Sequence, residues 1–285
     1  MEYIQGLPTA VKNSSGTQPP AHLTPVGATD CHMHIFDHRF PVISGRNPPE
    51  GTVDDYRKLM TRLGISRCVV VSPSSYGTDN RCLVDALKTL GDKARGVAAI
   101  GPDTSRSELQ ALHDAGVRGV RVNYGRVAGT SFDDVRRVSR QIADLPWALH
   151  LHAPADEIVE REKYLADLPC PLVIEHFGLA PQPGGENHPV TAALKRLTDG
   201  GNTYTKLSHL RETEARKYHH FTPLAKLLIN HMPERILWGS DWVHGTMEVK
   251  PDDAYLLDLL TAWCPSEDVR CTILVENPSR LYWSA

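Results

Sequence analysis

The chain has 285 residues, enough for one large domain, and carries 23% charged residues with a formal net charge of −3. This balance excludes the strong positive bias of nucleic-acid-binding proteins. No apolar run approaches the ~20 residues of a membrane span, and no basic segment with an apolar core opens the chain. The six cysteines are scattered without a CxxC pair, which favours reduced thiols and a cytoplasmic location. We therefore expect a protein that binds neither nucleic acid nor membranes.

The first 25 residues are rich in Pro, Ser, Gly and Thr and show no apolar periodicity. This composition predicts an extended N-terminal arm over 1–25, packed on the surface or partly disordered. A single domain is expected over 26–285.

From residue 26 onward, short β-branched runs alternate with helix-length amphipathic segments, the pattern of βα units around a parallel sheet. Eight strand-like runs start roughly every thirty residues, as in a (β/α)8 barrel. They are GATDCHMHIF (27–36), SRCVVVSP (66–73), RGVAAIG (95–101), VRGVRVNY (117–124), WALHLHAP (147–154), PLVIEHFG (171–178), NTYTKLSHL (202–210) and RILWGSDWVH (235–244). A dinucleotide-binding sheet would use fewer units, and no GxGxxG follows the first run. The sequence therefore predicts an α/β protein with the TIM-barrel fold.

Helices are predicted between these runs, over 53–64, 80–91, 105–116 and 251–264. In the third of them, Ser105 and Glu108 have the spacing of a capping box.

Polar side chains follow the strand-like runs at the end where barrels place their active sites. In the first run, His32 and His34 are two residues apart and so would point to the same face of a strand. The other candidates are Arg121, Asn123, Tyr124, Arg126, His150, His152, Glu175, His176, Ser208, His209, Arg211, Asp241 and His244. A ring of His and Asp at corresponding positions indicates a reaction centre.

Three of these motifs, DCHMH, EHFG and WGSDWVHG, resemble those of the amidohydrolase superfamily, and of its amidohydrolase-2 branch in particular. The stretches GTDNRCLVDALKTLGDKARGVAAI and ELQALHDAGVRGVRVN are most similar to 2-pyrone-4,6-dicarboxylate lactonase and related sugar-lactone and muconolactone hydrolases. The resemblance extends from about residue 26 to LVENPSRLYW at the C-terminus. It implies an amidohydrolase-like barrel and a hydrolase.

The resemblance assigns roles residue by residue. His32 and His34 match the strand-1 pair, His176 the strand-6 histidine and Asp241 the strand-8 aspartate. Arg121 stands where binuclear members carry a carboxylated lysine, and a guanidinium cannot become a carbamate, so a two-metal site is not expected. The arginines that resemble carboxylate-binding residues of the pyrone lactonase are Arg121, Arg126 and Arg211.

Two departures from the pyrone lactonase are visible. Leu179 replaces an arginine, so the substrate is expected to carry its acid groups elsewhere. His152 replaces a tyrosine, and mononuclear members use a strand-5 histidine as a metal ligand. His32, His34, His152 and Asp241 would then bind one Zn²⁺ or Mn²⁺ ion. A metal-independent reaction stays open, as does the choice between His150 and His152 for the inward face.

These assignments predict a hydrolase that opens the lactone ring of a carboxylate-bearing small molecule, in the catabolism of aromatic or sugar-acid compounds. Asp241 would activate water, His176 would donate to the developing oxyanion, and His32 and His34 would hold the metal or polarise the carbonyl. Tyr76, Tyr124 and His244 are expected to join the arginines in binding the substrate. Two alternatives stay open, a metal-dependent nonoxidative decarboxylase and a catalytically silent binding protein, and so does homo-oligomerisation.

Overall fold

The computed structural model of the protein describes residues 2–43, 45, 47–101, 103–124, 131–210 and 215–284. In these residues, eight parallel strands form one sheet in sequential order. They are β3 (Thr29–Met33), β4 (Arg67–Val71), β5 (Ala94–Ala98), β6 (Val117–Asn123), β7 (Ala148–His152), β8 (Leu172–Ile174), β9 (Thr203–Leu207) and β10 (Ile236–Trp238). All eight strand-like runs are confirmed. The predicted TIM-barrel fold is confirmed as well.

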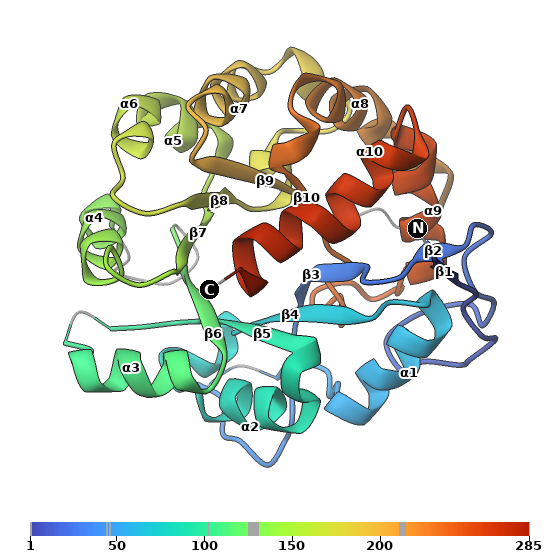
Figure 1. Ribbon diagram of the computed structural model, residues 1–285, viewed down its shortest axis with the longest axis horizontal. Coiled ribbons are helices and arrows are strands. Elements are labelled where there is room, and N and C mark those ends of the chain that lie inside the picture. Colours follow the sequence, from blue (N-terminus) through green and yellow to red (C-terminus); the bar gives the residue numbers. More distant parts are fainter. Residues whose placement is uncertain are drawn as a thin grey trace.

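The sheet curls into a nearly closed barrel, so that the first strand and the last lie side by side (Figure 1). Beyond β10, the backbone N–H of Asp241 donates to the carbonyl of His32 at 2.8 Å, and the N–H of His34 donates to the carbonyl of Trp242 at 2.7 Å. These bonds extend the closure past the strand ends. They also hold the DCHMH motif next to the WGSDWVHG motif.

Helices surround the barrel (Figure 1). The α-helices of the described residues are α1 (Val53–Leu63), α2 (Arg81–Leu90), α3 (Arg106–Asp114), α4 (Phe132–Gln141), α5 (Ala155–Glu160), α6 (Glu162–Ala166), α7 (Pro189–Asp199), α8 (Thr222–His231), α9 (Asp253–Trp263) and α10 (Glu267–Cys271). The predicted capping box is present at α3, where Ser105 accepts from the N–H of Glu108. None of the helices described is long and apolar enough to cross a membrane.

The C-terminal segment closes one end of the barrel. Tyr282, which is fully buried, packs on the small apolar cluster inside the barrel, and the neighbouring Trp283 ring lies under the guanidinium groups of Arg67 and Arg95. Both arginines stand near the amino ends of their strands. Because this segment covers the amino ends of the strands, an active site can open only at their carboxyl ends.

The N-terminal residues pack against the outer helices. β1 (Tyr3–Ile4) pairs antiparallel with β2 (Thr24–Pro25). From α1, the buried guanidinium of Arg62 donates to the carbonyls of Ser15, Gly16 and Gln18. The boundary at residue 25 between an arm and the barrel domain stays a prediction.

Candidate active site

A cavity of about 230 Å³ opens at the carboxyl ends of the strands. Its polar lining includes His34, Arg121, Asn123, His176, His209 and Asp241, which come from or directly follow β3, β6, β8, β9 and β10. The sequence places the site at this end of the barrel, and the polar residues do converge there.

Three of the lining residues sit in the left-handed region of the backbone. The φ angle is 57° at His176, 66° at His209 and 63° at Asp241. Residues other than glycine seldom adopt this conformation, and where they do, it is often at functional sites. Each of the three lies two or three residues past the end of its strand, so the chain turns sharply as it leaves the barrel and directs the side chain to the cavity.

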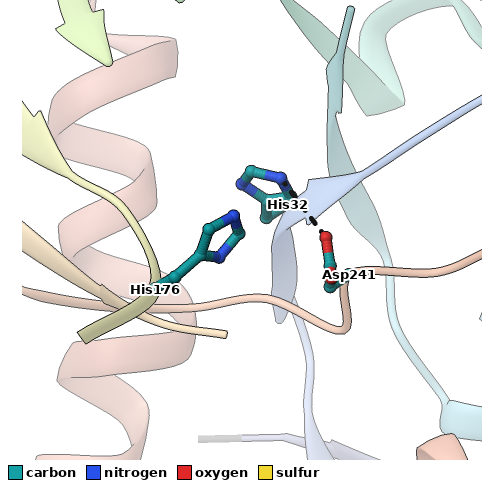
Figure 2. Close-up of side chains that lie close together, drawn as sticks. All are labelled: His32, His176 and Asp241. Carbon is teal, nitrogen blue, oxygen red and sulfur yellow. Dashed lines mark ion pairs between the residues drawn. The ribbon is translucent and has the colours of Figure 1, made fainter. Parts of the chain in front are cut away.

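The carboxylate of Asp241 lies at the centre of the site. Its Oδ1 is 3.6 Å from Nε2 of His32 and 3.6 Å from Nε2 of His34, and its Oδ2 contacts Nδ1 of His209. Figure 2 shows His32 and His176 on one side of this carboxylate. Burial alone would raise the pKa of Asp241, but His209, His34 and His176 together hold that pKa well below its usual value. Asp241 is therefore ionised.

The rings of His32 and His176 are neutral, and hydrogen bonds hold the rings of His34 and His176 in place. Burial lowers the pKa of His32 and that of His176 well below the usual value. His34 donates from Nδ1 to the carbonyl of Val71 at 2.8 Å, which orients its Nε2 toward Asp241. Nδ1 of His176 is 2.9 Å from the hydroxyl of Ser208.

A metal ion fits this arrangement. Among the described residues, His32, His176 and Asp241 can each offer one ligand atom, and these atoms lie within 4.8 Å of one another. Nε2 of His32 is buried and makes no hydrogen bond to the residues described, and Nε2 of His34 lies 3.6 Å from the same carboxylate oxygen. Two nitrogens facing one carboxylate oxygen favour a shared cation, with which nitrogen and oxygen donors are compatible.

The geometric group differs from the ligand set expected from the sequence. His32 and Asp241 belong to both, but the geometric group contains His176 and lacks the expected His34 and His152. His152 is buried, with its ring 5.4 Å from that of His176. His150 lies deeper in the barrel, where its Nδ1 is 3.1 Å from Nζ of Lys206 and its Nε2 is 3.4 Å from the hydroxyl of Tyr282.

A buried charge cluster lies beneath the histidines. Nε and Nη2 of Arg121 both reach Oε2 of Glu175 at 2.8 Å. Oε1 of Glu175 is 3.4 Å from Nδ1 of His32 and 3.8 Å from Nζ of Lys206. Burial would raise the pKa of Glu175, but Arg121, His32 and Lys206 hold it well below its usual value, and burial lowers the pKa of Lys206 to about 8. The guanidinium expected to bind substrate thus already has a protein partner, although it also lines the cavity.

The remaining expected substrate-binding residues are placed differently. Tyr76 exchanges hydrogen bonds with the backbone of Asp37, and the ring of Tyr124 packs edge-on against Phe132. Nε2 of His244 is 3.0 Å from Oδ1 of the buried Asp253. None of these three belongs to the described cavity lining. Arg126 and Arg211 lie outside the described residues.

His209 and Glu175 were expected only as strand-end residues without a role, and Lys206 was not expected at the site. His209 lines the cavity, contacts Asp241 and stacks on His176 at a ring-centre distance of 4.4 Å. Its place directly after a strand was the signal that could have found it. Lys206 could have been found as a lone cation within the apolar run of the seventh strand.

Comparison with known proteins agrees with this geometry. The family model described as Amidohydrolase matches residues 21–283. The chain belongs to the amidohydrolase family. A 2-pyrone-4,6-dicarboxylate hydrolase from Comamonas testosteroni is 34% identical, with 93% of this chain and 92% of the relative aligned. A 4-sulfomuconolactone hydrolase from Hydrogenophaga intermedia is 32% identical over 99% of this chain and 97% of the relative.

Two further similarities complete the comparison. A D-galactarolactone isomerase from Agrobacterium fabrum is 28% identical to this amidohydrolase, with 95% of this chain and 96% of the relative aligned. A solved apo structure from Agrobacterium tumefaciens is 26% identical, with a TM-score of 0.86 over 96% of this chain and 99% of that one. The resemblance read from the DCHMH, EHFG and WGSDWVHG motifs is confirmed. The similar proteins act on lactones, by hydrolysis in two cases and by isomerisation in one.

Proposed function

We propose that this amidohydrolase opens the ring of a carboxylate-bearing lactone by attack of water. The observation that carries the proposal is the ionised carboxylate of Asp241, which faces the cavity with Oδ1 3.6 Å from Nε2 of both His32 and His34. The reactions of the two hydrolase relatives support the same chemistry. The proposed setting is the catabolism of aromatic or sugar-acid compounds in the cytoplasm.

In the proposed reaction, Asp241 accepts a proton from the attacking water and later delivers it to the leaving oxygen of the ring. Because the pKa of Asp241 is held low, the base is ionised across the neutral range. A neutral His32 can approach the carbonyl without adding charge to the ground state. Arg121 lies at the cavity wall, where its guanidinium supplies positive charge toward a substrate carboxylate.

We propose that one divalent ion, Zn²⁺ or Mn²⁺, is held by His32, His176 and Asp241, with His34 next to them. Such an ion would polarise the lactone carbonyl and lower the pKa of a bound water. In this arrangement Nδ1 of His176 donates to Ser208, which leaves Nε2 as its ligand atom. His176 then acts through the ion rather than as the separate oxyanion donor expected from the sequence.

Two other reactions fit the same residues. A nonoxidative decarboxylase would use the cation and Arg121 to hold a carboxylate that departs as carbon dioxide. An isomerase would convert one lactone into an isomeric lactone. The relative from Agrobacterium fabrum is named as such an enzyme, a D-galactarolactone isomerase. A binding protein without activity is disfavoured, because a negatively charged carboxylate that lines the cavity would repel an acidic ligand rather than bind it.

Proton release separates these candidates. The purified protein is mixed with 2-pyrone-4,6-dicarboxylate or 4-sulfomuconolactone in weak buffer with a pH indicator. Ring hydrolysis creates a new carboxylic acid and lowers the pH, decarboxylation raises it, and isomerisation leaves it unchanged.

We expect acidification that Asp241→Asn abolishes while the melting temperature is retained. His231→Asn is the matched control, because this exposed histidine also pairs with an aspartate, Asp199, away from the cavity. Acidification at an undiminished rate by Asp241→Asn would overturn the proposed mechanism.

A further inference from the structure

His209 and Asp241 form a pair that the proposed reaction does not yet use. His209 lies two residues past β9 and Asp241 three residues past β10, and Nδ1 of His209 contacts Oδ2 of Asp241. Both side chains are about nine-tenths buried, at 10% exposure each, and both line the cavity. In this contact the carboxylate oxygen is the acceptor and Nδ1 of His209 the donor.

The contact leaves the two carboxylate oxygens with different surroundings. Oδ2 accepts from His209, while Oδ1 faces Nε2 of His32 and Nε2 of His34 at 3.6 Å each. A carboxylate held at one oxygen cannot turn about its last bond, and that torsion otherwise has a broad energy minimum. Without His209, neither oxygen would be fixed toward the two imidazoles.

The His209 ring is itself held on two sides. Its backbone φ of 66° turns the side chain back toward the cavity. Its face stacks on the ring of His176 at 4.4 Å between centres with an angle of 30° between planes, and His176 is anchored by Ser208. The donor therefore points at Asp241 in an orientation set by packing.

We propose that His209 is a positioning residue that pins Oδ2 of Asp241 and so presents Oδ1 to the reaction. The inference rests on the proposed function in one respect, that Asp241 is the base. Groups that hydrogen-bond to a metal-ligating side chain orient it, and their loss costs about 10- to 100-fold in metal affinity or activity. The role is played through Asp241, without contact to the reacting atoms.

The test compares two side chains of nearly equal size. His209→Asn keeps an N–H donor close to the position of Nδ1, whereas His209→Leu has the same shape and no donor. Both remove the ring, so a difference between them reports the hydrogen bond alone. Asparagine is also among the residues that best tolerate a positive φ.

We expect His209→Leu to lower kcat by about 10- to 100-fold with little change in KM, and His209→Asn to recover most of that loss. Equal activity of both variants and the wild type would overturn the proposal, and so would an equal loss in both, because the ring rather than the donor would then matter. If His209→Leu does not fold, His209→Gln takes its place. The glutamine amide lies one methylene further from the backbone than that of asparagine, so it should not restore the lost activity.

A structural measurement keeps this test separate from the proposed function. In crystal structures of the variants, Oδ1 of Asp241 should stay near Nε2 of His32 and His34 in His209→Asn and turn away in His209→Leu. This readout needs no substrate. An unmoved carboxylate in His209→Leu refutes the positioning role, whereas a moved carboxylate in a protein that hydrolyses no lactone refutes only the proposed function.

Discussion

The carboxylate of Asp30 ties the first strand of the barrel to the segment after the last strand, at Ser240. Oδ1 accepts from the backbone N–H of Ser240 at 3.0 Å and Oδ2 from its hydroxyl at 2.6 Å. Oδ1 also accepts from the N–H of His32 at 3.0 Å. Because His32 and Asp241 adjoin these groups, the buried Asp30 sets the separation between two reactive side chains.

This buried carboxyl makes stability depend on pH. Burial raises the pKa of Asp30 to about 6, against an ordinary value of 3.8, despite the donors from Ser240, His32 and Tyr56. The folded state then holds the proton more tightly than the unfolded state, so stability is greatest below pH 3.8 and falls as the pH rises toward 6. Two pKa units correspond to about 3 kcal/mol.

We predict that the unfolding free energy of the wild type, taken relative to that of Asp30→Asn, falls by about 3 kcal/mol between pH 4 and pH 6. Above pH 6 this difference should stay constant. Urea unfolding of both proteins across this range measures the difference, in which all other titrating groups cancel. A difference that does not change with pH would show that Asp30 is ionised in the folded protein throughout.

A second prediction concerns the buried pair of Arg121 and Glu175. Arg121→Met should cost about 3–5 kcal/mol of unfolding free energy, because it leaves the fully buried Glu175 carboxylate without its main partner. Arg121→Met combined with Glu175→Gln should recover most of this. Arg196→Met serves as the control, since its pair with Glu162 has the same short contacts but is exposed and should cost below about 1 kcal/mol. An equal loss in the single and double variants would argue against a buried charge cluster.

The barrel was predictable from sequence because its strands are short, apolar and regularly spaced. Runs such as RCVVV and LVI are fully or nearly fully buried, and a buried parallel strand leaves a nearly continuous apolar signature. The DCHMH and WGSDWVHG motifs were equally easy to recognise. Histidine and aspartate next to a buried apolar strand seldom serve packing and therefore indicate a functional site.

The partners within the site could not be predicted, because they depend on register between strands. Arg121 and Lys206 reach Glu175 from β6 and β9. The local sequence does not indicate which residues of neighbouring strands lie side by side. The choice of His176 over His152 in the metal group has the same origin. The positive φ of His176 and Asp241 is also invisible in the sequence, since neither residue is itself a glycine.

His244 offers a test between two roles. The sequence suggested substrate binding, whereas Nε2 of His244 is 3.0 Å from the fully buried Asp253. We predict that His244→Leu lowers the unfolding free energy by about 1–3 kcal/mol, because a buried acceptor loses its donor, and leaves KM unchanged. His244→Gln, whose amide can reach the position of Nε2, should restore stability. A raised KM with unchanged stability would instead support a substrate-binding role for His244.

The last prediction separates the two metal-ligand sets. After dialysis against Zn²⁺ and then metal-free buffer, elemental analysis of the wild type should find one ion per chain. His176→Ala should lose this ion, because it removes one of the three groups whose ligand atoms lie within 4.8 Å of one another. His152→Ala should keep it, and His231→Ala controls for binding at exposed histidines. The opposite pattern, an ion retained by His176→Ala and lost by His152→Ala, would restore the strand-5 histidine as the ligand. A wild type that retains no ion would leave Asp241 and the neutral histidines to activate water unaided, since the carboxylate is ionised by its protein neighbours alone.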